Sequence, residues 1–142
     1  KEPEVVVTME TKGIPLALMT ADALGIPTVV VRHGNKVTEG SSVSINYVSG
    51  SSKRIQTMSL TRKALETGRK VLIIDDFLKA GGTARGIMSL MQEFDAEVVG
   101  LGVLMEVAVE NTSRLVDKYH ALLQLAEVDP LSKKSVVIAN KL

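Results

Sequence analysis

Two adjacent carboxylates precede a glycine turn in the stretch VLIIDDFLKAGGTA, residues 71–84. Gly81 and Gly82 let the backbone approach a ligand closely, because glycine has no side chain and tolerates positive φ. The pattern that follows predicts a helix from Thr83, so unpaired N–H groups and the positive end of the helix dipole face the turn. This combination predicts an anion site that suits a phosphate.

The two acids, Asp75 and Asp76, suit a different part of the same ligand. An ionised carboxylate only accepts hydrogen bonds, and a vicinal diol offers two donors. Phosphate on the turn and a diol on the acids together describe a ribose 5-phosphate. The alternative is that the acids cap their own turn and the glycines only tighten it. The turn has neither a Walker A ending nor a Gly-x-Gly-x-x-Gly pattern, so a nucleoside triphosphate or dinucleotide site is not supported.

An α/β sheet is the framework that would hold these residues. Alternating strand and helix patterns predict a mostly parallel sheet covered on both faces, in which ligands bind beyond the carboxyl ends of the strands. Between His33 and Thr57 the sequence is polar, and VSINYV (43–48) predicts an exposed strand in a long hairpin or flap. Buried or late strands are predicted at 4–9, 26–33, 70–75, 97–107, 121–128 and 135–140, and helices at 16–25, 60–68, 83–96 and 111–120.

Composition limits the class of protein. The 142 residues are 45% hydrophobic, enough for one α/β domain with a core. The chain has no cysteine, which excludes disulfides and thiolate sites and fits a reducing, cytoplasmic location. No apolar run approaches a membrane span and no signal-peptide pattern is present, so we expect no membrane partner. The start KEPEVVV, without an initiator methionine, predicts a fragment of a longer protein.

The stretch at 71–84 resembles the phosphoribosyl pyrophosphate signature of type I phosphoribosyltransferases. The resemblance implies a five-stranded parallel core with a flexible hood. It also implies that Asp75 and Asp76 bind the ribose hydroxyls and that the loop from Lys79 through Ala80 to Thr83 surrounds the 5-phosphate. Many members have Thr or Ser where this chain has Ala80, so one hydroxyl donor is absent while the backbone donors remain.

A second anchor follows the first predicted strand. TKGIP (11–15) is similar to the family's pyrophosphate loop, which implies that backbone N–H groups of Thr11, Lys12 and Gly13 hold the diphosphate, in some members beside a non-proline cis peptide. Taken alone, Thr-Lys-Gly is more often a surface turn. Basic side chains after the second strand are predicted to add charge to this site: Arg32 and Lys36. His33 stands where the family often has a second basic residue.

The run HGNKVTEGSSVSINYVSGSSKRIQTMSL (33–60), with DDFLKAGGT (75–83) after it, resembles the effector domains of the purine operon repressors of Gram-positive bacteria, and the similarity covers nearly the whole chain. That resemblance implies that residues 1–142 form a non-catalytic effector-binding domain, with a winged-helix DNA-binding domain missing upstream. It further implies a homodimer whose operator affinity falls when phosphoribosyl pyrophosphate binds, with magnesium on the diphosphate and no other cofactor. The alternative is an enzyme, a purine phosphoribosyltransferase for a 6-oxopurine such as xanthine, whose loops look similar.

Phe77 directly follows the acids and has two interpretations. Its ring could stack on a base, which would let purine nucleotides such as guanosine tetraphosphate compete at the same site. Core packing is the other interpretation.

Basic pairs place six positive charges within 18 residues, between Lys53 and Lys70. Such a stripe could contact DNA phosphates, although a charge run is more often a solvated face. The residues predicted for DNA contact are Lys53, Arg54, Arg62 and Lys63. His33 and His120 lack metal-ligand spacing, so no metal site is predicted.

Overall fold

The computed structural model describes residues 1–35, 40–49, 53–107, 115–129 and 134–140. Eight strands form one mixed sheet in the order β3-β4-β2-β1-β5-β6-β7-β8. The strands are β1 (Val5–Met9), β2 (Thr28–His33), β3 (Ser42–Val48), β4 (Ile55–Thr61), β5 (Lys70–Leu78), β6 (Glu97–Val107), β7 (His120–Asp129) and β8 (Lys134–Ala139). Five neighbours in the middle, β2-β1-β5-β6-β7, are parallel, and β4, β3 and β8 continue the sheet antiparallel. The predicted α/β class and five-stranded parallel core are confirmed, within a larger sheet.

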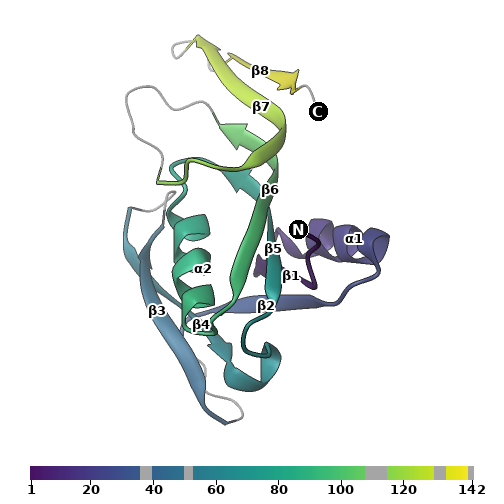
Figure 1. The fold of residues 1–142 in the computed structure, drawn as a ribbon. Helices are drawn as coiled ribbons and strands as arrows, with labels where there is room; N and C mark the ends of the chain where they lie inside the picture. Colours follow the sequence, from purple (N-terminus) through teal and green to yellow (C-terminus); the bar gives the residue numbers. More distant parts are fainter. Residues whose placement is uncertain (36–39, 50–52, 108–114, 130–133, 141–142) are drawn as a thin grey trace.

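The helices α1 (Ile14–Leu24) and α2 (Gly82–Gln92) lie on opposite faces of this sheet (Figure 1). All five residues of β1 are buried, because this short apolar strand lies between β2 and β5 with a helix on each side. On one face, Ala17 and Ala21 of α1 pack against Val6 and Ile74. On the other, the core includes residues of α2, among them Ile87, Leu90 and Met91. The carboxyl ends of β1 and β5 therefore sit side by side at the centre of the molecule.

Two predicted helices are wrong. For residues 60–68, β4 continues to Thr61 and only a 3₁₀ turn, η1 (Arg62–Ala64), follows. Leu60 is buried and pairs with Val43 of β3, so cross-strand packing overrides the local helical spacing. In the range 111–120, residues 115–119 are not helical and His120 already belongs to β7; residues 111–114 lie outside the described part of the chain.

The predicted hood is the hairpin β3–β4, which is built into the sheet. Its register with β2 is set by two pairs, Arg32 with Ser59 and His33 with Met58. The hairpin also packs on α2: a Cβ atom at Gly86 would lie 2.7 Å from Met58 Cε and 2.9 Å from Tyr47 Cβ. This close approach fixes the hairpin against the helix that begins at the glycine turn.

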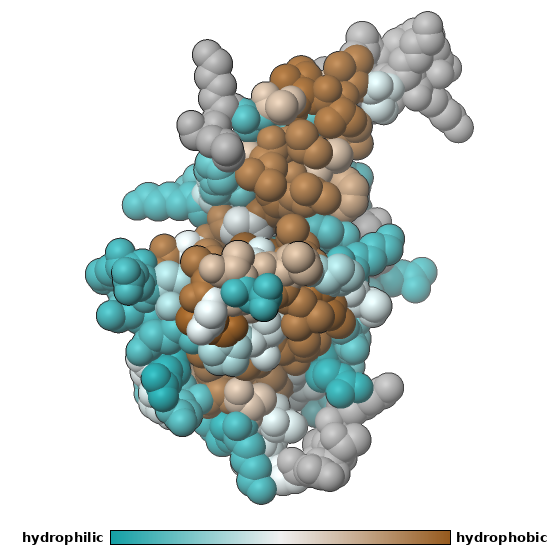
Figure 2. Space-filling view, turned by 90° about the vertical axis from the view of Figure 1, so that its right-hand side faces the viewer, coloured by the Kyte–Doolittle hydropathy of each residue, from teal (hydrophilic) through white to brown (hydrophobic). Residues whose placement is uncertain are grey.

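On the face of the sheet that carries α1, a band of exposed apolar side chains lies beyond the helix. Gly100 and Gly102 of β6 face Leu72 and Ile74 on the α1 side, so Leu104 points to that side too. In the register of β6, β7 and β8, the exposed side chains that share this face are Leu104, Leu122, Val136 and Ile138. Figure 2, which looks at this side, shows apolar surface running up the molecule. None of the described helices is long and apolar enough to cross a membrane.

Candidate functional site

A cavity of about 650 Å³ opens at the carboxyl ends of β1 and β5. This volume lies in the range of small-molecule sites. Eleven predicted site residues line it, from two segments of the chain: Thr11, Lys12, Gly13, Asp75, Asp76, Phe77, Lys79, Ala80, Gly81, Gly82 and Thr83. The structure thus brings the acid pair, the glycine turn and the 11–13 loop together around one space.

The strand predicted at 70–75 ends too early, and both acids belong to the observed strand. β5 runs on to Leu78, so Asp75 and Asp76 lie within the strand and Phe77 and Leu78 separate them from the glycine turn. Asp75 Oδ1 accepts a hydrogen bond from the Asp76 N–H (2.8 Å), and Asp76 Oδ1 accepts one from the Phe77 N–H (2.9 Å). Each carboxylate thus accepts a hydrogen bond from the next residue's N–H within the strand, which is not the predicted capping of a turn, and both side chains line the cavity.

The surroundings of Asp75 change the pKa of its carboxyl. Burial, followed by its interaction with Asp76, raises the pKa of the Asp75 carboxyl to about 7. Burial and the neighbouring carboxylate disfavour the charge of Asp75, so near pH 7 roughly half of the Asp75 carboxyls carry a proton. A ligand that donates hydrogen bonds to the pair would favour the ionised form.

The glycine turn presents the amino end of α2 to the cavity. Gly81 has φ 90°, a conformation that favours glycine, and the space where its Cβ would lie is 2.6 Å from Val116 Cγ2. The turn is held from behind by a hydrogen bond from the Leu115 N–H to the Ala80 carbonyl (2.9 Å). The N-cap residue of α2, Gly81, has no side chain that could cap the helix, so N–H groups of its first turn can bind an anion at the cavity wall.

The 11–13 loop packs directly on the acid pair. A Cβ atom at Gly13 would lie 2.5 Å from Thr8 Oγ1 and 3.0 Å from Asp75 Oδ1, so only glycine fits there. The Glu10–Thr11 peptide bond is cis. These contacts join residues that are about sixty positions apart in the chain into one wall.

Two predicted residues are not placed at the cavity. Arg32 is exposed and does not line it; its Nε lies 3.6 Å from Glu10 Oε2, so its charge is paired with an acid. Lys36 lies outside the described residues.

Phe77 is 49% exposed and lines the cavity, so the core-packing interpretation is wrong. Its ring is available to a ligand at the site. The neighbouring Leu78 is buried, as alternation along β5 requires.

The sequence interpretation missed a polar wall contributed by the β3–β4 hairpin. Tyr47 donates a hydrogen bond to Gln56 Oε1 (3.0 Å), and its hydroxyl lies 3.4 Å from His33 Nδ1. Glu10 joins this wall to the 11–13 loop, because its carboxylate accepts a hydrogen bond from the His33 N–H (2.6 Å). The alternation in VSINYVS could have predicted this wall, because positions 43, 45, 47 and 49 share the inward face of the strand.

The predicted basic stripe is not continuous. Lys53 and Arg54 precede β4 and Arg62 and Lys63 follow it, and a seven-residue strand separates its ends by roughly 20 Å. All four are exposed, and the Arg62 guanidinium lies over the Phe94 ring at 6.0 Å.

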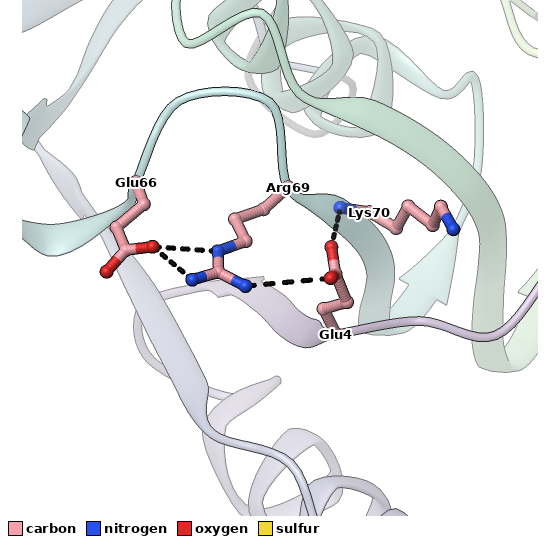
Figure 3. A network of polar contacts seen from close by, with 4 residues as sticks. All are labelled: Glu4, Glu66, Arg69 and Lys70. Atoms are coloured by element: carbon pink, nitrogen blue, oxygen red, sulfur yellow. Dashed lines mark hydrogen bonds and ion pairs between the residues drawn. The ribbon is translucent and has the colours of Figure 1, made fainter.

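Arg69, at the end of the basic run, has acidic partners. Its guanidinium pairs with Glu66 and with Glu4, and Glu4 also accepts a hydrogen bond from the Lys70 N–H (2.8 Å), as Figure 3 shows. These contacts raise the pKa of Arg69 and lower that of Glu4. Arg69 therefore helps to hold the start of β1 beside the start of β5, and the acids partly neutralise its charge.

A protein-family model described as "Phosphoribosyl transferase domain" matches residues 1–140. The chain belongs to the phosphoribosyl transferase domain family. This membership agrees with the solved structures: an adenine phosphoribosyltransferase from Rhodothermus marinus superposes with TM-score 0.72 and 28% identity, over 88% of this chain and 71% of that one.

Within the family, this phosphoribosyl transferase domain is similar to named transcription regulators. The "Purine biosynthesis transcriptional repressor PurR" of Bacillus subtilis is 56% identical over 99% of the chain, and the "Purine biosynthesis transcriptional activator PurR" of Lactococcus lactis is 43% identical over 91%. The chain spans about half the length of these regulators, 48% and 47%. A "Xanthine phosphoribosyltransferase" of Lactococcus lactis is 36% identical over 94% of the chain and 69% of its own length. The predicted resemblance to Gram-positive purine repressors is confirmed.

Proposed function

We propose that this domain is the effector-binding part of a transcription regulator of purine synthesis and that phosphoribosyl pyrophosphate is its effector. The observation that carries the proposal is one cavity lined together by the acid pair, the glycine turn before α2 and the 11–13 loop, whose backbone N–H groups suit phosphate oxygens. Acceptors for a diol flanked by donors for two phosphate groups match the ligand's ribose, 5-phosphate and diphosphate.

Each ligand group has a place in this arrangement. The ribose hydroxyls donate to Asp75 and Asp76, and the 5-phosphate accepts hydrogen bonds from the turn at 80–83 and the amino end of α2. The diphosphate lies on the 11–13 loop, with Lys12 beside it. Magnesium comes with the diphosphate, whose oxygens suit this hard cation, and it reduces the repulsion between the phosphates and the acids. The exposed Phe77 ring gives purine nucleotides such as guanosine tetraphosphate a stacking surface for competition.

The regulatory part of the proposal concerns the longer protein. In it, a winged-helix domain binds the operator as a homodimer in the cytoplasm, and effector binding lowers operator affinity. This requires the effector to bind the DNA-competent and DNA-incompetent states with different affinities. Support comes from the names of the regulators to which the domain is 56% and 43% identical. Lys53, Arg54, Arg62 and Lys63 are proposed as phosphate contacts at two separate places.

The second candidate function is a purine phosphoribosyltransferase. The 36% identity to a xanthine phosphoribosyltransferase and the open cavity favour it. Catalysis would require a purine held beside the ribose with water excluded, which the binding proposal does not need.

Calorimetric titration with phosphoribosyl pyrophosphate and magnesium tests the binding proposal. Asp76→Asn should weaken binding by about tenfold or more, because a charge-assisted hydrogen bond is lost. Asp22→Asn, an exposed change on α1, is the control and should bind as the unmodified chain does. Absence of binding by the unmodified chain, or equal binding by Asp76→Asn, would refute the proposed site.

A further inference from the structure

Thr8 has a buried hydroxyl without a hydrogen-bond partner. The residue is 0% exposed in β1, and among the described residues its Oγ1 is the buried side-chain polar atom left unpaired. Such an atom destabilises the folded state, since water no longer solvates it and no protein group replaces the water. Unpaired groups of this kind are rare in native proteins and call for an explanation.

The position of Thr8 connects this hydroxyl with the candidate site. Thr8 does not line the cavity, whereas Gly13 and Asp75 do, so Thr8 lies behind them. Thr8 Oγ1 and Asp75 Oδ1 both lie within 3.0 Å of one point, the place where a side chain at residue 13 would begin. Because residue 13 is glycine, it places no side-chain atom of its own between the two oxygens.

We propose that Thr8 is a positioning residue for Asp75: its hydroxyl donates a hydrogen bond to the Asp75 carboxylate when that carboxylate is ionised and holds the hydroxyl groups of a ligand. The inference rests on the proposed function and deepens it. Gly13 then has two roles, as part of the loop that faces the ligand and as the gap through which the hydroxyl reaches the acid.

The electrostatics of the acid pair support this role. Without ligand, burial raises the pKa of Asp75 to about 7, so its carboxyl keeps a proton for much of the time and needs less help from donors. Ligand hydroxyls favour the ionised form, and a buried anion requires further donors. The Asp76 N–H supplies one at 2.8 Å, and the Thr8 hydroxyl is the unpaired donor nearest to the gap at Gly13.

Three variants test the inference, with the unmodified chain in the same experiments. Thr8→Val replaces the hydroxyl by a methyl group of similar size, Thr8→Ser keeps the hydroxyl, and Thr8→Ala is a second variant without it. The readouts are the binding constant for phosphoribosyl pyrophosphate with magnesium, by calorimetry, and the unfolding temperature without ligand.

We expect Thr8→Val to bind about tenfold more weakly, the effect of losing one hydrogen bond to a charged acceptor. Its unliganded unfolding temperature should rise by about 3 °C, because the unpaired buried hydroxyl is gone. Thr8→Ser should bind like the unmodified chain. If Thr8 had only a structural role, Thr8→Val would not weaken ligand binding while raising the unfolding temperature.

Equal binding by Thr8→Val and the unmodified chain would overturn the inference and leave the proposed function intact. So would Thr8→Ser binding as weakly as Thr8→Val. If Thr8→Val does not fold, Thr8→Ala against Thr8→Ser decides by the same comparison. If the unmodified chain does not bind, the proposed function fails and this inference fails with it.

Discussion

Asp75 is the residue of the candidate site whose protonation is coupled to the stability of the folded chain. Its pKa, raised to about 7 by burial and by Asp76, exceeds that of an unfolded chain, so the folded state binds more protons between about pH 4 and 7. The stability that this proton contributes is complete below pH 4 and is lost as the pH rises through 7. The site therefore costs the unliganded protein stability at neutral and alkaline pH.

Asp75→Asn removes this cost, because the amide stays neutral at every pH. At pH 8 the variant should be more stable than the unmodified chain by on the order of 3 kcal/mol, and at pH 5 the difference should be much smaller. Urea unfolding at both pH values measures it, with the exposed Asp22→Asn as the control. A difference that does not change with pH would show that Asp75 titrates normally.

Gly13→Ala tests the close packing of the 11–13 loop on the acid. The new Cβ atom would lie 2.5 Å from Thr8 Oγ1 and 3.0 Å from Asp75 Oδ1, so the loop must move away. We expect a loss of about 1–3 kcal/mol in the free energy of unfolding, together with weaker effector binding. Gly100→Ala is the matched control, since its Cβ meets only the end of the Leu72 side chain, at 3.1 Å. Equal effects of the two changes on binding would contradict the proposed loop contact.

The sequence predicted those site residues that are close together in the chain. Asp75, Asp76 and the glycine turn are adjacent in the chain, so their chemistry can be read locally. Tyr47 and Gln56 were missed because the hairpin brings them to the cavity from another part of the sheet. Arg32 was predicted to contribute charge to the site, but it pairs with Glu10. This acid follows β1, a different strand, so the pairing is not visible in the local sequence.

Among the elements, the β3–β4 hairpin and α2 are the pair whose contact shapes the cavity. Gly86 allows it, because a Cβ there would meet Tyr47 Cβ at 2.9 Å and Cγ at 3.2 Å. Gly86→Ala should lower the free energy of unfolding by about 1–3 kcal/mol, although alanine favours a helix. Hydrogen exchange of the β3 amides should quicken in the same variant. Unchanged exchange with higher stability would show that the hairpin does not pack on α2.

Element type was predictable where periodicity and burial agree, as in β1, β5, β6 and α2. The prediction failed at 60–68 and at 115–120, where helical spacing competes with pairing across the sheet. Leu60 opposite Val43 and His120 opposite Gly102 are contacts between distant segments, which local spacing does not contain.

At the scale of the whole molecule, the two faces of the sheet differ beyond α1. Val103 and Leu104 are neighbours in β6 and point to opposite faces, 3% and 37% exposed. Leu104→Lys should change the free energy of unfolding by less than about 0.5 kcal/mol, whereas Val103→Lys should prevent folding. Thermal unfolding of the two variants compares them. A severe effect of Leu104→Lys would mean that this apolar band is covered in solution.

We propose that the domain binds phosphoribosyl pyrophosphate without consuming it. Phosphorus NMR measures both properties at once, with the ligand, magnesium, the domain and a mixture of xanthine, guanine, hypoxanthine and adenine. We predict shifted or broadened ligand signals and no base-dependent release of pyrophosphate. Pyrophosphate that appears only when a purine is present would contradict the claim and identify an enzyme, and unchanged ligand signals would contradict the binding site itself.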